Sequence, residues 1–410
     1  RVHALILSAI KSNFKSVLTD CPHREKLGWL ECTHLLAGCF MYNFDSSRFY
    51  EKIARDMREA QLEDGLVPDI APEYVVFAGG FRDSPEWGSG AVIAPWRSYW
   101  MYGDPTILQE QYATMKRYVG YLGGKAEGHI VSYGLGDWCD IGPASPGVSQ
   151  LTSLGLTATG VYYQDIDTVR RVAELLGHPA EAAEYAALGQ TVAGAFNREF
   201  FHSDQGSYDR NSQTGNAMPL VLGLVAPEAR PVVLESLAKI IEAGGNRVTA
   251  GDIGFYYVVQ ALLEGGRSDL IYEMLCQEEG PGYLYQLAKG AEEWFYSGLL
   301  GIRAAAPGFR EIQLVPQVVG DLTSANGHYD SMYGRIASAW QRNGDRVTFE
   351  FTVPVNTKAT VHIPARSPQD VMELGVPVAR AEGVTPLRNS PGTAVFEIGS
   401  GSYRFESRMP

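Results

Sequence analysis

The stretch AVIAPWRSYWMYGDPTILQEQYATMKRYVGYL, residues 91–122, decides how the first part of the chain folds. Two segments rich in apolar residues flank the sequence Gly103-Asp104-Pro105. Glycine commonly ends a helix, and proline is favoured at the first position of the next helix. The stretch therefore predicts two helices, 91–102 and 104–122, joined by a tight turn.

The same paired pattern recurs on both sides of this hairpin. Many segments open with Ser, Thr, Asp, Asn or Pro, which favour helix starts, and their apolar residues return at helical spacing. No sequence period is visible, which argues against a solenoid. Long loops at 64–90, 123–150 and 276–290 instead favour a closed helical barrel with its site on loops at one end. The other helices are predicted over 2–18, 33–42, 46–63, 153–176, 179–196, 216–224, 227–243, 252–264, 268–276 and 292–305.

The pattern changes after Pro307, where apolar and polar residues begin to alternate. Alternation with period two, interrupted by Asn-Gly, Gly-Asp and Pro turns, is typical of an antiparallel β-sandwich. We therefore predict a mainly α chain with two domains, a helical barrel over residues 1–305 and a C-terminal antiparallel β-sandwich over residues 306–410. The strands are predicted over 311–316, 334–340, 346–353, 357–363, 393–399 and 402–405.

Composition excludes several classes of function. The chain has 410 residues and a net charge of −13, without a Lys/Arg cluster, so we expect neither a nucleic acid nor a membrane as partner. No apolar run is long enough to span a bilayer. The five cysteines form no CxxC pair, so we expect neither a disulfide framework nor a zinc site. We also expect no other metal and no cofactor. The sequence begins with Arg1 and shows no signal peptide, so a mature form or a fragment is expected, and a periplasmic, secreted or cytoplasmic location stays open.

The sequence DCPHREKLGW, residues 20–29, is the strongest candidate for chemistry. It joins two predicted helices and concentrates acids, cations and a Trp in a short loop. One interpretation is a helix cap with surface ion pairs. The other is a carboxylic acid that protonates a leaving oxygen, which requires a raised pKa. Trp29 would then be the apolar wall and Asp20 the neighbouring carboxylate, while Arg24 would hold Asp20 ionised and bind sugar hydroxyls.

Two further clusters also place an acid beside a Trp at the end of a loop. They are GGFRDSPEWGS at 79–89, which contains Trp87, and GDWCD at 136–140, which contains Asp137 and Trp138. Carboxylates bind sugar hydroxyls and Trp faces stack on sugar rings, so three such clusters in one domain favour a carbohydrate site. The sequence does not indicate phosphate binding, a zinc-dependent protease or a serine hydrolase, because it has no phosphate-binding Gly loop, no HExxH and no GxSxG.

These segments resemble the bacterial α-L-rhamnosidases of glycoside hydrolase family 78. The resemblance rests on DCPHREKLGW at 20–29, PEWGSGAV at 85–92 with Pro95-Trp96, GLGDW at 134–138 and EWFYSGLLGI at 293–302, in family order. It implies an (α/α)6 barrel followed by a β-sandwich, and hydrolysis of terminal α-L-rhamnosides with inversion. The substrate would be a rhamnose-containing glycoside or polysaccharide, and a homodimer stays open. The resemblance assigns Glu25 as general acid, Asp20 and Arg24 as sugar-binding residues, and Trp29, Trp87 and Trp138 as aromatic walls.

Two positions depart from the family pattern. Cys32 stands where the family often has Asp, with Glu31 beside it. The family's general base is a Glu in a segment that would lie between Gly290 and Ala291, and this segment is absent here. An inverting enzyme needs such a base roughly 6.5–9.5 Å from the acid. Two alternatives therefore stay open: a lyase acting on a rhamnose–uronic acid bond, and a non-catalytic carbohydrate-binding homologue.

Glu292 and Glu293 lie directly after this junction. Both open a predicted helix, where acids interact favourably with the helix dipole. We therefore expect a structural role for them and do not assign either as the base.

Overall fold

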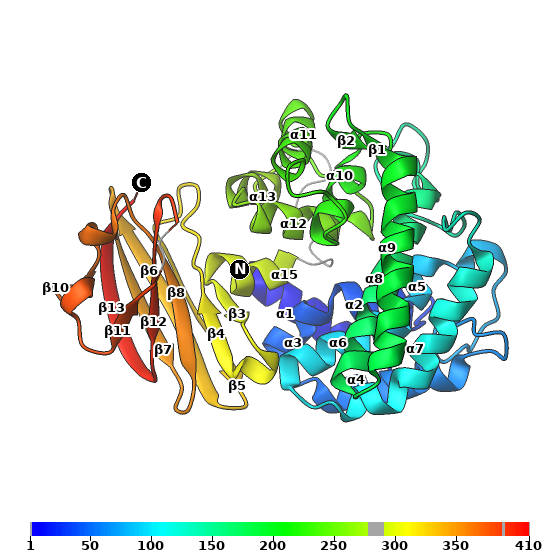
Figure 1. Ribbon diagram of the computed structural model, residues 1–410, viewed down its shortest axis with the longest axis horizontal. Coiled ribbons are helices and arrows are strands. Elements are labelled where there is room, and N and C mark those ends of the chain that lie inside the picture. Colours follow the sequence, from blue (N-terminus) through cyan, green and yellow to red (C-terminus); the bar gives the residue numbers. More distant parts are fainter. Residues whose placement is uncertain (1, 278–290, 388–389, 410) are drawn as a thin grey trace. The chain divides into compact units, whose positions relative to one another are not determined.

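The computed structural model describes residues 2–277, 291–387 and 390–409. Its chain divides into two compact units (Figure 1). The helical unit contains residues 1–40, 45–98 and 105–291, and the strand unit contains residues 41–44, 99–104 and 292–410. The sequence predicted a boundary at 305/306, whereas the main division falls at 291/292.

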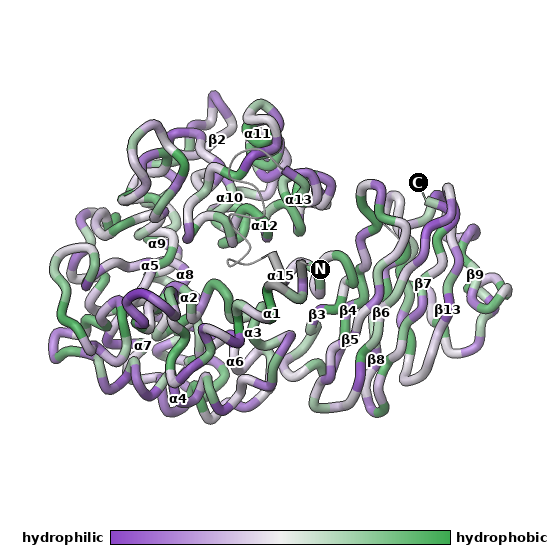
Figure 2. The backbone as a smooth tube through the Cα atoms, turned by 180° about the vertical axis from the view of Figure 1, so that it is seen from behind, coloured by the Kyte–Doolittle hydropathy of each residue, from purple (hydrophilic) through white to green (hydrophobic). Residues whose placement is uncertain are grey.

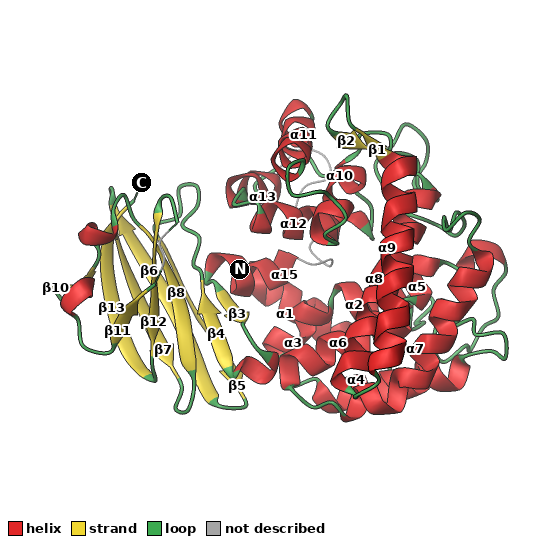
Figure 3. Ribbon diagram, in the orientation of Figure 1, coloured by secondary structure: helices red, strands yellow, loops and turns green. Residues whose placement is uncertain are grey.

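The helical unit consists mainly of consecutive α-helices, as the apolar spacing predicts, with one short hairpin of β1 (Phe201–His202) and β2 (Ser207–Tyr208) (Figure 3). Glycine and proline mark the predicted turns: Gly103 has φ 79°, and Pro179 occupies the first turn of its helix. No helix in the described part of the chain is long and apolar enough to cross a membrane. The helices are α1 (Val2–Asn13), α2 (Leu30–Leu35), α3 (Ala37–Asn43), α4 (Ser47–Ala60), α5 (Pro85–Gly88), α6 (Gly90–Tyr102), α7 (Thr106–Lys125), α8 (Leu154–Leu175), α9 (Pro179–Phe200), α10 (Gln213–Val221), α11 (Arg230–Ala243), α12 (Gly254–Glu264) and α13 (Ser268–Leu275).

The buried faces of the helices build the core of this unit. In α8, the Ser153 side chain accepts a hydrogen bond from the Leu156 amide (3.3 Å) and so caps the helix. α12 is buried along most of its length, and its tube is largely green in Figure 2. Its apolar side chains include Val258, Val259 and Leu262, none more than 2% exposed. Burial of this kind supplies most of the stability of such helices.

The strand unit is a two-sheet sandwich. One sheet has the order β10-β9-β13-β7-β6-β5 and the other β11-β12-β8-β4-β3. Phe349, Phe351, Phe396 and Phe405 are each at most 2% exposed and form its core. Among the described residues of this unit, all strand pairings are antiparallel except β4 with β8, which is parallel. The main strands are β3 (Ile302–Ala304), β4 (Glu311–Leu314), β5 (Ser324–Ser331), β6 (Gly334–Asn343), β7 (Arg346–Val353), β8 (Lys358–Pro364), β9 (Met372–Glu373), β10 (Val376–Pro377), β11 (Val384–Pro386), β12 (Thr393–Ile398) and β13 (Gly401–Arg408).

Two predicted helices are interrupted, and a third, predicted over 2–18, ends early at Asn13. The helix predicted over 33–42 is broken at Leu36 into α2 and α3. The helix predicted over 292–305 is α15 (Ala291–Trp294) and a π-helical turn (Phe295–Leu299), followed by β3. Gly301 causes this second change. Its φ is 70°, and a Cβ there would lie 2.1 Å from the backbone carbon of Val315, so the chain turns sharply and pairs with β4.

Candidate active site

The loop between α1 and α2 is closed by its own backbone. The Asp20 amide donates to the Leu27 carbonyl (3.3 Å), and the Lys26 amide donates to the Cys21 carbonyl (3.2 Å). Lys26 has φ 59°, the left-handed conformation that reverses the chain. The closure brings carboxylate or thiol atoms of Asp20, Cys21 and Glu25 within 4.8 Å of one another. The two acids that the sequence singled out are therefore neighbours in space.

Glu25 and Arg24 both remain accessible in this loop. Arg24 Nε lies 3.8 Å from Glu25 Oε2, and the side chains are 73% and 29% exposed. A contact this exposed contributes little to stability. Both groups are thus available to a ligand.

An aromatic group of four rings, Trp29, Phe77, Phe81 and Trp138, belongs to three different loop segments. Trp29 stacks on Phe77 with ring centres 5.4 Å apart and meets Phe81 edge-on at 6.4 Å. Phe81 in turn meets Trp138 edge-on at 5.3 Å. The group links two of the three tryptophans predicted as sugar walls. Phe77 was missed, and Phe81 was assigned no role although it lies in the cluster at 79–89, because aromatic residues in this long loop follow no period.

Trp87, the third predicted wall, has a different environment. It lies in α5 and is 3% exposed. Its ring is therefore part of the packed interior, and its contact with a sugar stays a prediction.

Cys32 lies against two carboxylates at the start of α2. Its Sγ is 3.2 Å from Glu31 Oε1 and 3.9 Å from Asp20 Oδ1. Glu31 and Cys32 also line a small cavity together with Asp252 and Tyr256, two residues that the sequence did not single out. The position where the family often has Asp thus holds a thiol among acids.

Cys21 is not activated as a nucleophile. Burial raises the pKa of its thiol to about 11, and the negative charges of Asp20 and Glu25 add to the effect. A thiol with this pKa stays protonated at neutral pH and reacts poorly.

Asp137 has a structural position. Its carboxylate is fully buried and accepts hydrogen bonds from Thr214 Oγ1 (2.5 Å), the Gly251 amide (3.0 Å) and the Gly254 amide (2.7 Å). Burial raises the pKa of Asp137 to about 6, although these three bonds oppose the shift. The carboxylate ties the loop before Trp138 to α10 and to the start of α12. Its predicted contact with a sugar hydroxyl stays a prediction.

Glu86 and His34 are two buried titratable residues, and the His34 ring contacts the Glu86 backbone. His34 Nε2 is 2.8 Å from the backbone oxygen of Glu86, and burial lowers the pKa of His34 to about 4. The Glu86 side chain is fully buried, which raises its pKa from 4.5 to about 7 against a smaller opposing effect of Thr157. The two groups therefore change stability with pH in opposite directions.

The Glu86→Gln variant is expected to gain stability, relative to the unmodified protein, as the pH rises. A carboxyl whose folded-state pKa is raised contributes stability below its unfolded pKa, and this stability is lost as the pH rises through the folded pKa. For Glu86 the loss occurs between about pH 4.5 and pH 7, and the shift corresponds to about 3 kcal/mol. Urea unfolding of both proteins across this range should show the variant gaining relative stability with pH. A constant difference would contradict the prediction.

Two family models match the chain and together span most of it. The model described as the bacterial alpha-L-rhamnosidase 6 hairpin glycosidase domain matches residues 1–295. The chain belongs to this family. The bacterial alpha-L-rhamnosidase C-terminal domain matches residues 301–376. The predicted (α/α)6 barrel followed by a β-sandwich is thereby confirmed.

Named members of the rhamnosidase family are similar along the whole chain. A curated α-L-rhamnosidase of Streptomyces avermitilis is 29% identical, over 99% of this chain and 41% of the relative. One from Formosa agariphila is 26% identical, over 98% of this chain and 47% of the relative. The chain therefore spans less than half the length of these relatives. The Streptomyces alignment runs over 439 positions against 410 residues here, so that relative has at least 29 residues (439 − 410) without a counterpart.

Solved rhamnosidase structures share the fold. The α-L-rhamnosidase from Dictyoglumus thermophilum superposes with a TM-score of 0.90 at 28% identity, over 99% of this chain and 49% of that one. The Streptomyces avermitilis enzyme complexed with L-rhamnose gives a TM-score of 0.89 at 28% identity, over 99% and 41%.

Proposed function

We propose that this chain hydrolyses terminal, non-reducing α-L-rhamnosyl residues with inversion, and that Glu25 is the general acid. The observation that carries the proposal is the closed loop that holds Glu25 next to Asp20. Similar proteins also support the proposal. They are named α-L-rhamnosidases, and the structure of one of them was solved in complex with L-rhamnose.

The other residues of the loop supply binding in this proposal. Asp20 and Arg24 bind sugar hydroxyls, since carboxylates and guanidinium groups form strong charge-assisted hydrogen bonds. Trp29 and Trp138, which both contact Phe81 in the aromatic group, offer faces to the sugar ring. Glu25 then donates its proton to the glycosidic oxygen as the bond to the aglycone breaks.

Inversion needs a second carboxylate that activates water. Glu31 and Asp252 line the cavity beside Cys32, and we propose these two for that role. The family's base segment would follow Gly290, and residues 278–290 lie outside the described part of the chain.

Proton NMR of the reaction with an aryl α-L-rhamnoside tests the proposal. We expect free L-rhamnose to appear first as the β-anomer, because water attacks the face opposite the leaving group. The α-anomer as first product would contradict inversion. Folded protein that binds L-rhamnose in calorimetry without any release would show a non-catalytic carbohydrate-binding protein instead.

A lyase remains the second candidate, on one observation. The Arg97 guanidinium lies 4.6 Å above the Tyr256 ring, and Tyr256 lines the same cavity as Asp252. A cation beside a tyrosine fits proton abstraction next to a uronic carboxylate. A rhamnose–uronic acid polysaccharide that yields an unsaturated, ultraviolet-absorbing product would establish the lyase and contradict the hydrolase.

A further inference from the structure

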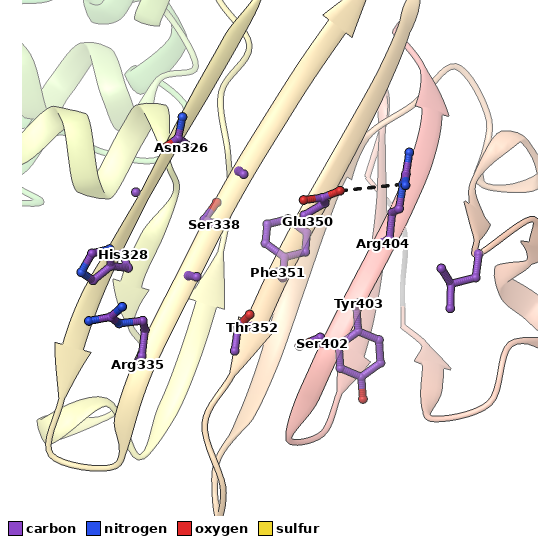
Figure 4. A pocket seen from close by; sticks show the side chains of 14 residues that line it. Asn326, His328, Arg335, Ser338, Glu350, Phe351, Thr352, Ser402, Tyr403 and Arg404 are labelled. Carbon is purple, nitrogen blue, oxygen red and sulfur yellow. Dashed lines mark ion pairs between the residues drawn. The ribbon is translucent and has the colours of Figure 1, made fainter.

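The outer face of the six-stranded sheet carries a groove along β6, entirely within the strand unit. Its volume is about 570 Å³, within the usual size of small-ligand sites, about 300–1,000 Å³. Figure 4 shows side chains from neighbouring strands around it. Its lining residues belong to the strand unit, whereas Glu25 belongs to the helical unit.

Strand register explains the shape of the groove. Asn326, Ala339, Glu350 and Arg404 are paired in one row across β5, β6, β7 and β13. His328, Ala337, Thr352 and Ser402 form the next row on the same face. In both rows the residue on β6 is alanine, with longer side chains on either side. The two alanines form a floor of methyl groups between polar walls.

The polar walls offer hydrogen-bonding groups to solvent. Glu350 and Arg404 are 61% and 53% exposed, and Arg404 Nε is 3.9 Å from Glu350 Oε1 (dashed in Figure 4). This distance is too long for a hydrogen bond between the two atoms. On the β5 side His328 is 48% exposed, and Arg335, which precedes the two alanines on β6, is 58% exposed. Planar donors and acceptors on both sides of an apolar floor match a ring that has hydroxyls at its rim and C–H groups on its face.

The charges of the face decide which ligand fits. Arg335 forms a two-pronged ion pair with Asp330 (2.8 and 3.1 Å), and Arg404 is paired with Glu350. Each arginine is thus balanced by an acid, so an anionic ligand gains no net attraction. A neutral ligand rich in hydroxyl groups does not depend on a net charge of the groove and can hydrogen-bond to both the acids and the arginines.

We propose that this groove binds a neutral segment of a sugar chain, as a second carbohydrate site of the protein. The choice of a sugar rests on the proposed function, since a rhamnoside-cleaving enzyme meets sugar chains. A binding site away from the cleaved bond would raise the local concentration of the substrate and slow its departure.

Calorimetric titration of the full chain tests the groove. A neutral rhamno-oligosaccharide and, separately, a neutral gluco-oligosaccharide are titrated into the Glu25→Gln variant with excess free L-rhamnose present. We expect a site that free L-rhamnose does not displace. Arg404→Ala removes a charged hydrogen-bond donor and should weaken it about tenfold. Ala339→Glu, which fills the floor, should abolish it.

Arg408→Ala is the matched control, because Arg408 lies on the same strand and face as Arg404 and does not line the groove. Equal weakening by both arginine variants, or no binding of either sugar, would overturn the proposal. The proposal would also be overturned if the protein binds no sugar and is a dimer that Arg404→Ala converts to a monomer. That result would identify the face as a subunit interface. Release of L-rhamnose from an aryl rhamnoside by the unmodified chain reports separately on the proposed function.

Discussion

Replacing Glu25 with Gln is expected to lower kcat for a rhamnoside with a poor leaving group about 1,000-fold, within the usual contribution of a general acid. Gln keeps the size and polarity of the side chain but carries no transferable proton. Glu25 lies on the surface of a closed loop with its side chain 29% exposed, so the substitution leaves no buried gap. Initial rates of L-rhamnose release from an alkyl rhamnoside, at saturating substrate, measure the effect.

A leaving-group comparison separates acid catalysis from damage to the loop. An aryl rhamnoside whose phenol is acidic needs little protonation, so Glu25→Gln should slow its cleavage far less than that of the alkyl rhamnoside. His23→Gln is the control within the same loop, since His23 is exposed and takes no part in the proposed chemistry. It should leave both rates within about twofold of the unmodified protein, as surface changes usually do. Equal losses on both substrates in Glu25→Gln would show that Glu25 does not protonate the leaving group.

The helices could be predicted because each is a local, amphipathic element with clear end signals. The segment predicted over 153–176 is α8, Leu154–Leu175, with Ser153 as its cap. The errors arise where a distant contact decides the backbone. Gly301 ends the last helix because its backbone packs against Val315 and β3 pairs with β4, and neither partner is visible in the local pattern.

The same limit applies to the candidate site. Asp20, Arg24 and Glu25 could be predicted together because they lie within six consecutive residues of the sequence. Phe77 and Phe81 could not, since they reach Trp29 and Trp138 from a separate loop. A sequence that places an acid next to a Trp also does not predict the direction in which the carboxylate points. The Asp137 carboxylate accepts hydrogen bonds from donors 77 to 117 residues away in the sequence. Removing this carboxylate is therefore expected to have a large effect on stability.

Asp137→Ala is expected to destabilise the helical unit by about 4 kcal/mol near pH 5, because each buried donor left without an acceptor costs about 1–3 kcal/mol. The substitution removes the acceptor of Thr214 Oγ1 and of the Gly251 and Gly254 amides. The pKa of Asp137 is raised to about 6, so the stability it contributes is lost as the pH rises from 3.8 through 6. The difference between variant and unmodified protein should therefore shrink toward pH 8. Urea unfolding at both pH values measures it.

Asp137→Asn and Thr214→Val show whether these hydrogen bonds are the cause. The Asn amide offers one acceptor oxygen in place of two, so one of the three donors loses its partner and the expected loss is about 1 kcal/mol. Thr214→Val removes the donor that shares Oδ2 with the Gly251 amide. In the Asp137→Ala background the Thr214 hydroxyl has already lost this acceptor, so Thr214→Val should cost less there than in the unmodified protein. Additive losses, or a loss in Asp137→Ala that grows toward pH 8, would show that the carboxylate does not hold α10 and α12 in this way.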